Sequence, residues 1–397
     1  MKKQRLRIKV LALFLFGLFA LLAVCGGYTV LTNRDRWFAS SHNARIRAQK
    51  QSVTAGSVLD RNGVVLAAND AEGNRVYAED AAVRKALVHI LGDGAGHISN
   101  GVEDFHASYL YGFRTSLGER ISLLFSGGER IGDTLQLTLS AELCARISGA
   151  LRDRGVEAGA AVILDWQTGE ILAMTSLPAF DPVPDGTAVP GTAYLNRATR
   201  YPYAPGAVFG PVAAACAEAA PRPLQKAAEA FGFNDNFLFA DIVVENSVYP
   251  TDLSETALEA RLRGEGGIRA TPLHLCMTAA AAANGGAMMT PRLIRMVYTP
   301  ENRVRVNPAP TEYRTAFAPE ATERVRAAFA DRGDGILGIG TQTCFLGYLK
   351  DTDTPWAVCV VAEGSMDESV PAGVASEVIG WYREFTAPGR NSAARGE

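Results

Sequence analysis

The apolar residues of the chain form one long uninterrupted run near the N-terminus and a series of shorter runs after it. The long run covers residues 10–31. At about 1.5 Å per residue, a helix of this length crosses the roughly 30 Å hydrocarbon core of a bilayer. A basic segment over residues 1–9 precedes the run, with charges from Lys2, Lys3, Arg5, Arg7 and Lys9. The pattern predicts a transmembrane helix over residues 10–31.

The charges beside this run predict its orientation. Beyond it, Arg34 and Arg36 are diluted by Asp35, so the positive charge is concentrated on the N-terminal side, which we expect to be cytoplasmic. A cleaved signal peptide is the competing interpretation, but the run exceeds about 15 residues and lacks an Ala-x-Ala-like site. A lipoprotein anchor at Cys25 is disfavoured because the preceding Val24 is bulky. We therefore predict a single-pass protein of the cell membrane whose main domains are extracytoplasmic.

Shorter apolar runs predict the secondary structure of the next part. Residues 57–67 read as a hairpin, since Asn62-Gly63 suits the two positive φ angles of a type I′ turn. Residues 135–139 alternate like a strand, and Ser140 after them is a plausible N-cap. The helix that follows would place three apolar residues on one face, namely Leu143, Ile147 and Leu151.

The second part of the chain alternates strands with apolar helices. Residues 159–174 predict two strands around an Asp-x-x-Thr-Gly turn, and residues 336–348 and 357–361 predict further strands. An apolar helix should stop at Asn284-Gly285-Gly286, where glycine can adopt a left-handed conformation. Residues 374–385 predict a closing amphipathic helix. This order favours an α+β domain with helices packed on an antiparallel sheet.

Composition narrows the class of protein. The chain has 397 residues, enough for two or three domains, and a net charge of −3 that gives no sign of nucleic-acid binding. The five histidines are scattered singly, so we expect no metal site and no cofactor. Beyond the membrane run the cysteines have no close partner and lie among apolar residues, so we predict buried thiols at Cys144, Cys216, Cys276, Cys344 and Cys359.

The stretch 203–211 is the feature around which the second part is organised. Pro205-Gly206 predicts a turn, and an alanine-rich run from Val212 to Ala220 follows it. The first turn of such a helix presents unpaired N–H groups and the positive end of the helix dipole. The layout is typical of a helix start that carries a functional group.

These segments together resemble the transpeptidase domain of class B penicillin-binding proteins. The resemblance is carried by residues 159–174, 176–182 and 195–198, by Phe231-Gly232-Phe233, and by residues 264–275. It implies a transpeptidase-like α+β domain over residues 156–388 and a disordered tail over residues 389–397. Residues 56–63 and 101–112 resemble segments of the family's membrane-proximal pedestal, which implies a β-rich pedestal over residues 33–155.

The motifs that carry the family's chemistry are missing. The resemblance places Ala207 where the family has its nucleophilic serine and Gly210 where it has the proton-accepting lysine. The family's Ser-x-Asn pattern occurs only at residues 41–43, beside the membrane run, and its Lys-Thr-Gly strand is replaced. We expect no catalytic residue, and six former active-site positions: Ala207, Gly210, Gly338, Ile339, Gly340 and Thr341.

The interpretation that follows is a membrane-anchored, catalytically silent relative acting as scaffold or regulator in peptidoglycan synthesis during division, elongation or sporulation. The resemblance implies polytopic glycosyltransferases or other cell-wall synthesis proteins as partners. One alternative is an active transpeptidase or carboxypeptidase with an unrecognised nucleophile. Another is a module that binds peptidoglycan or β-lactams noncovalently, since covalent binding needs the absent serine.

Overall fold

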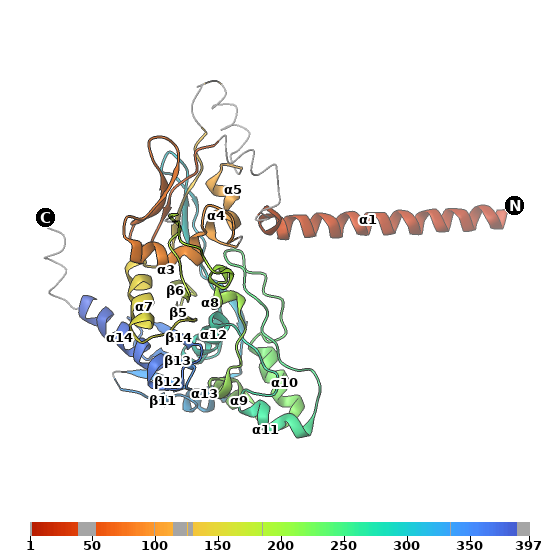
Figure 1. Cartoon of the computed structure of the whole chain (residues 1–397). Coiled ribbons are helices and arrows are strands. Elements are labelled where there is room, and N and C mark those ends of the chain that lie inside the picture. The colour runs from red at the N-terminus through yellow and green to blue at the C-terminus, as the bar shows by residue number, and fades with distance from the viewer. Residues whose placement is uncertain are drawn as a thin grey trace.

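The computed structural model describes residues 2–38, 53–98, 100–113, 125, 130–184, 186–333 and 335–386. Helix α1, Lys2–Phe38, projects away from the body of the protein (Figure 1). Within it, Lys9–Thr29 is long and apolar enough to cross a membrane, and no part of that span is buried in the protein. It is the one such helix in the described part of the chain. The predicted tail at residues 389–397 lies outside the described residues.

A mixed six-stranded sheet lies beside the inner end of α1. All its strand pairs are antiparallel except β1 with β4, which is parallel. Apolar side chains point inward from the paired positions Val58, Leu135 and Val297, which are almost fully buried. The strands in spatial order are β3 Arg75–Tyr77, β2 Val65–Asn69, β1 Val58–Leu59, β4 Thr134–Leu137, β8 Ile294–Tyr298 and β9 Val304–Val306.

The hairpin predicted over residues 57–67 is confirmed, but its predicted type I′ turn is wrong. Gly63 has a φ of 87°, whereas Asn62 is not among the described residues with positive φ. The carboxylate of Asp60 determines the turn, because it accepts hydrogen bonds from the backbone N–H groups of Asn62 at 2.7 Å and Val64 at 2.9 Å. This local acceptor stabilises a longer connection than the two-residue turn.

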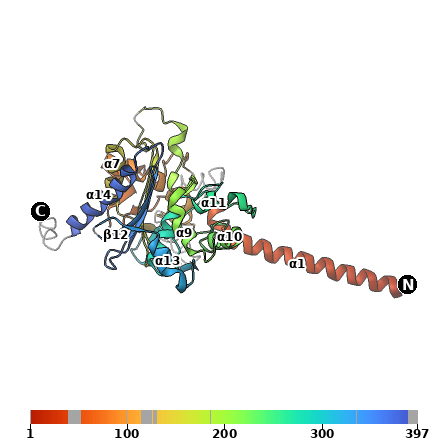
Figure 2. The same ribbon diagram turned by 90° about the horizontal axis from the view of Figure 1, so that it is seen from below.

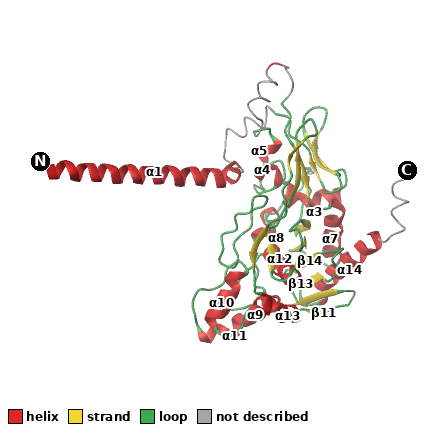
Figure 3. Ribbon diagram, turned by 180° about the vertical axis from the view of Figure 1, so that it is seen from behind, coloured by secondary structure: helices red, strands yellow, loops and turns green. Residues whose placement is uncertain are grey.

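An antiparallel six-stranded sheet forms the centre of the second part (Figure 3). Strands β5, β6, β13 and β14 are buried on both faces, which their nearly continuous apolar sequences predict. The predicted strand pair over residues 159–174 and the strands near residues 336–361 are thus confirmed. In spatial order the strands are β11 Ala330–Asp331, β12 Ile336–Gly340, β13 Cys344–Leu349, β14 Trp356–Ala362, β5 Gly159–Asp165 and β6 Ile171–Leu177.

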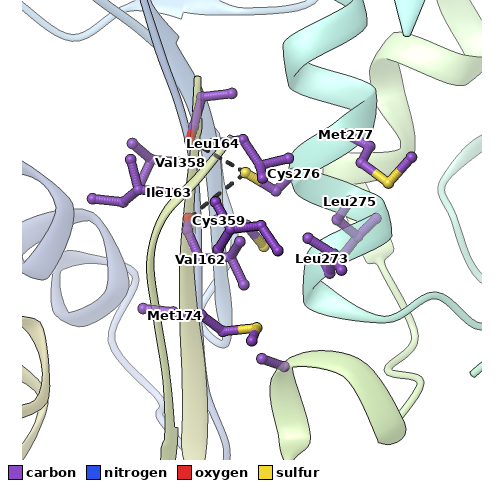
Figure 4. Packing of buried hydrophobic residues seen from close by; sticks show 14 of the residues in the cluster. Val162, Ile163, Leu164, Met174, Leu273, Leu275, Cys276, Met277, Val358 and Cys359 are labelled. Atoms are coloured by element: carbon purple, nitrogen blue, oxygen red, sulfur yellow. Dashed lines mark hydrogen bonds between the residues drawn. The ribbon is translucent and has the colours of Figure 1, made fainter. Parts of the chain in front are cut away.

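Helices cover both faces of this sheet (Figures 2 and 4). Helix α12, Pro272–Ala283, packs on one face, with Cys276 against Val162 and Cys359. Helices α7, Ala141–Asp153, and α14, Ser369–Thr386, pack together on the other. The Ser140 hydroxyl caps α7 as predicted, by accepting the N–H of Leu143 at 3.4 Å. The α+β fold with helices on an antiparallel sheet is therefore confirmed.

The two parts of the chain share elements across the boundary predicted at residue 155. Strands β8 and β9 come from residues 294–306 yet complete the first sheet, and α7 packs against α14. Helix α3, Ala81–Leu91, contacts both α7 and β6. The division into residues 33–155 and 156–388 stays a prediction. The first six-stranded sheet nevertheless contains strands from both sides of residue 155.

Two sequence predictions near residue 215 are wrong. Helix α9, Gly210–Ala215, ends before Cys216, so the alanine-rich run to Ala220 is not one helix. Residues before a proline avoid the helical region, and Ala220 is extended ahead of Pro221, where helix α10, Pro221–Ala230, begins. Cys216 is half-buried rather than a core thiol, while Cys144, Cys276, Cys344 and Cys359 are buried as predicted.

Short elements complete the fold. The stop of α12 at Asn284 is confirmed, with positive φ at Gly285 and Gly286. Strands β7 Ala287–Met289 and β10 Glu312–Thr315 form a separate pair. The others are α4 Val102–Phe105, α5 Ala107–Leu110, η1 Gly191–Tyr194, α8 Arg197–Arg200, η2 Gly206–Phe209, η3 Glu255–Ala257, α11 Leu258–Leu262, η4 Pro319–Ala321 and α13 Thr322–Ala327.

Candidate functional site

A tight backbone contact holds the turn at Pro205-Gly206. The N–H of Gly206 donates to the carbonyl oxygen of Gly264 at 3.1 Å. In return, Gly264 adopts a φ of 73°, and a Cβ at that position would lie 2.0 Å from the carbonyl oxygen of Gly206. Only glycine fits such an approach. Residues 264–275, which carried part of the resemblance, thus position the start of η2.

The turn places η2 and α9 directly beside β12, which is next to the edge strand β11 of the central sheet. A Cβ at Gly206 would lie 3.7 Å from Cγ2 of Thr341, and a Cβ at Gly210 would lie 3.5 Å from Cδ1 of Ile339. The predicted positions on η2, α9 and β12 therefore meet in space, although more than 125 residues separate them in the sequence. Ala207 is exposed at this junction, so a methyl group stands where the resemblance implies a nucleophilic hydroxyl.

The opposite face of β12 is occupied by other side chains. A Cβ at Gly338 would lie 2.5 Å from the ring of Phe345, which is buried. A Cβ at Gly340 would lie 2.6 Å from the carboxylate oxygen Oε1 of Glu368. Glu368 is paired with Arg332 at 3.4 Å. An aromatic ring thus lies against Gly338, where the resemblance implies a lysine, and a carboxylate lies against Gly340.

Thr341 retains a hydroxyl, but the turn between β12 and β13 uses it. Its Oγ1 donates to the carbonyl oxygen of Cys344 at 3.2 Å and accepts the N–H of Cys344 at 2.9 Å. The N–H of Thr341 donates to the same carbonyl at 2.7 Å. These bonds close the turn and satisfy the hydroxyl locally. Thr341 therefore has a structural role in this arrangement.

A buried acid–base cluster lies beside the turn. The carboxylate oxygen Oε1 of Glu363 accepts hydrogen bonds from Nε of Arg197 at 2.8 Å and from the Tyr203 hydroxyl at 2.6 Å. Burial, followed by the contact with Glu363, raises the pKa of Tyr203 well above its ordinary value. The tyrosine therefore stays protonated, and it acts as a donor to Glu363 instead of a base.

The thiols of Cys144, Cys216, Cys276 and Cys359 are each buried or hydrogen-bonded. Cys216 lies at the far end of α9 from Ala207, and its Sγ donates to the carbonyl oxygen of Glu218 at 2.7 Å. Burial raises the pKa of Cys144 to about 12 and moves the pKa values of Cys276 and Cys359 in the same direction. Thiols that are buried and protonated are poor nucleophiles. In the described residues no group of three or more potential ligands could hold a metal ion.

The sequence analysis missed three residues that shape the site. Phe345 was seen only as a strand residue, although its pairing with Gly340 follows once β12 and β13 are aligned. Glu363 and Glu368 follow β14 in the sequence and carried no motif. Their positions depend on how residues 363–369 turn back toward β12, which no local pattern predicts.

Comparison with known proteins agrees with this geometry. Residues 159–222, which contain β5, β6 and the turn at 205–206, match the penicillin binding protein transpeptidase domain family. The peptidoglycan D,D-transpeptidase PbpA of Mycolicibacterium smegmatis is 22% identical over 391 aligned residues, which cover 79% of either chain.

Solved structures share the fold. Penicillin-binding protein A from M. tuberculosis, as its imipenem acyl-enzyme complex, matches with a TM-score of 0.73 at 20% identity, over 83% of this chain and 98% of that one. The D,D-transpeptidase domain of a peptidoglycan glycosyltransferase from Eggerthella lenta matches with a TM-score of 0.65 at 20% identity, over 85% and 99%. The chain is therefore similar to the penicillin-binding protein transpeptidase family, with one segment that matches that family's domain and with the same fold over most of its length.

Proposed function

We propose that the chain is a penicillin-binding-protein-like protein of peptidoglycan synthesis whose transpeptidase domain is catalytically silent. The observation that carries this proposal is the junction of η2, α9 and β12. There Gly206 and Gly210, on either side of Ala207, lie against a strand that contributes Thr341 and Ile339, and the Thr341 hydroxyl is engaged in its own turn. The likeness to the M. smegmatis transpeptidase supports the cell-wall assignment.

Acyl transfer at this junction would lack two of its three requirements. The reaction needs a hydroxyl nucleophile, a base to accept its proton, and donors that stabilise the oxyanion. Alanine and glycine provide neither of the first two. Loss of nucleophile and base together leaves only residual rate enhancement from binding and oxyanion donors.

The proposed location is the cell membrane, with α1 as a single-pass anchor. Lys9–Thr29 has the length and hydropathy of a membrane span. The basic residues before it support a cytoplasmic N-terminus, and the two sheets would then be extracytoplasmic. In this arrangement residues 33–155, completed by β8 and β9, form a pedestal, and residues 156–388 form the domain that it carries.

We assign the protein a role as scaffold or regulator, with polytopic glycosyltransferases or other cell-wall synthesis proteins as partners. The E. lenta relative is a transpeptidase domain of a glycosyltransferase, which supports this class of partner. The α1 helix is exposed along the whole span Lys9–Thr29, so its lateral surface is available to another membrane helix. The test is copurification of the full chain from native membranes with such an enzyme.

The silence of the domain is tested by intact mass spectrometry of the full chain after incubation with excess penicillin. We expect no mass gain, while the M. smegmatis relative labelled alongside gains one acyl group. A stoichiometric adduct on this chain would overturn the proposal, and peptide mapping would then identify the nucleophile. The first alternative in the sequence analysis would be correct in that case.

A further inference from the structure

A cavity of about 170 Å³ lies far from the junction described above, between the two parts of the chain. Its walls come from the end of α3 and from α4 on one side, and from β6, η1, α8 and the loop at residues 241–243 on the other. Ten of the lining residues are aliphatic or aromatic, and the other seven, with His89, Arg200 and Asp241 among them, are polar or charged. A cavity that combines apolar walls with convergent polar groups suits a small molecule that has both kinds of surface.

His89 on α3 presents a buried acceptor at this cavity. Its ring is 2% exposed, and Nε2 lies 2.7 Å from the carbonyl oxygen of Ala193. A carbonyl oxygen only accepts, so the ring proton is on Nε2 and Nδ1 carries a lone pair. Burial lowers the pKa of His89 to about 4, which keeps the ring in this neutral form at pH 7. Among the described residues Nδ1 has no hydrogen-bond partner.

Arg200, at the end of α8, also lines this cavity, and its side chain is 33% exposed. Its Nε is buried and has no hydrogen-bond partner among the described residues. Glu245 is the carboxylate paired with it, and its Oε2 lies 3.7 Å from Nε, beyond hydrogen-bond distance. His89 and Arg200 lie on adjoining segments of the chain. The side-chain amide of Asn196 donates to the carbonyl oxygen of His89 at 3.4 Å, and Arg200 lies one turn after Asn196.

Buried polar atoms without partners are uncommon, and each costs about 1–3 kcal/mol. A ligand that satisfies both must donate to Nδ1 of His89 and accept from Nε of Arg200. Asp241 also lines the cavity and favours a positive group, whereas the Arg200 guanidinium favours a negative one. The aliphatic walls leave room for a short apolar side chain, contributed by Ile90, Ile98, Val102, Met174, Ile242 and Leu293.

We propose that this cavity binds a small aliphatic amino acid, with its ammonium group on His89 Nδ1 and its carboxylate on Arg200 Nε. A cavity of about 150 Å³ holds a molecule with six heavy atoms, which is the size of alanine. Both parts of the chain contribute walls, so the bound ligand bridges α3 and α8. This inference does not depend on the silence of the transpeptidase domain.

The test is isothermal titration calorimetry of the full chain in detergent micelles with each enantiomer of alanine. We expect one site, with at least one enantiomer bound, and ethylamine and acetate bound at least about tenfold more weakly because each satisfies one polar group. The His89→Gln variant keeps an N–H near Ala193 but replaces the ring acceptor Nδ1 by an amide oxygen at a different position, which should weaken binding about tenfold. Arg200→Gln should weaken it by about tenfold or more.

The exposed residue Arg222 on α10 supplies the matched control, since Arg222→Gln changes the same charge away from the cavity and should bind alanine as the parent chain does. Binding that survives both cavity substitutions unchanged would overturn the proposal. So would the absence of any heat with either enantiomer at about 10 mM, which the parent chain alone can show. If His89→Gln does not fold, two other measurements decide the question: the alanine titration of Arg200→Gln, and the titrations of the parent chain with ethylamine and acetate.

Discussion

The middle of the central sheet differs in what its side chains do from the edge region, which consists of β12 and the two-residue outer strand β11. In the middle, β5 and β14 pair over seven residues each and are almost completely buried against α12. At the edge, β12 is half-buried, contains Gly338 and Gly340, and faces the start of α9 (Figure 2). The middle supplies apolar burial, which is the main source of folding free energy. The edge contributes much less burial.

Under the function proposed above, this difference would explain how a transpeptidase-like fold stands without transpeptidase chemistry. The positions that would carry the chemistry are Ala207, Gly210 and residues 338–341, and most of them lie at the margin of the core. Replacing side chains at a margin removes little buried area. Fold and site are therefore separable here, as function depends on a site and not on a fold.

The largest difference in the free energy of unfolding should be found between substitutions at two residues that are paired on neighbouring strands of the sheet. Ile339 on β12 is paired with Leu346 on β13, and Leu346 is fully buried whereas Ile339 is half-buried. Leu346→Ala should lower the free energy of unfolding by about 3 kcal/mol, within the usual cost of a core cavity. Ile339→Ala should cost about 1 kcal/mol, because the site can admit water. Urea unfolding of both variants measures the contrast, and equal costs would refute the distinction between middle and edge.

The next effect concerns the two glycines of β12. Gly338→Lys restores the cation that the resemblance implies, but its Cβ would lie 2.5 Å from the Phe345 ring, so we expect a loss of about 2 kcal/mol. Gly340→Lys is the matched control, because its neighbour is the far end of the flexible Glu368 side chain, which can move and pair with the new ammonium group. We expect the control to change the melting temperature little. A lysine tolerated equally at both positions would show that Phe345 does not block the strand.

A smaller effect should appear with pH in the core beside α12. Burial lowers the pKa of His274 to about 4, and its Nε2 lies 2.8 Å from the carbonyl oxygen of Phe231. The unfolded chain binds a proton near pH 6.5, so this contribution to stability is complete above pH 6.5 and is lost as pH falls toward 4.

At pH 5 the loss amounts to about 2 kcal/mol relative to pH 8. His274→Phe removes the titrating group and should flatten the fall in melting temperature between pH 8 and 5. His89 has a pKa lowered to about 4 and titrates over the same range, so some pH dependence will remain. If the variant and the parent chain show the same pH dependence, His274 is not the buried titrating group that this geometry requires.

The sequence predicted the elements whose signals are local. The apolar strands over residues 159–174, the Ser140 cap and the glycine stop after α12 each follow from a few adjacent residues. The turn at Asn62 was wrong because the Asp60 carboxylate competes for the backbone N–H groups. The site residues at α9 and β12 came from the family resemblance. Glu363, Glu368 and the cavity at His89 could not be predicted, since they depend on contacts between segments far apart in the chain.

The smallest expected effect is also the most informative about the edge. The double variant Ala207→Ser, Gly210→Lys restores the implied nucleophile and base, and both fit: Ala207 is exposed, and a Cβ at Gly210 makes ordinary contacts of 3.5 Å with Ile339 and 4.0 Å with Ala328. We expect the double variant to fold with an unchanged melting temperature and to gain no mass with penicillin. The reason is that β12 still lacks its cation and hydroxyl. Adding Ile339→Thr, whose side chain faces Gly210, should produce at most partial labelling. Full acylation of the double variant would show instead that the chemistry was lost at η2 and α9 alone, and that β12 is still competent to bind a substrate.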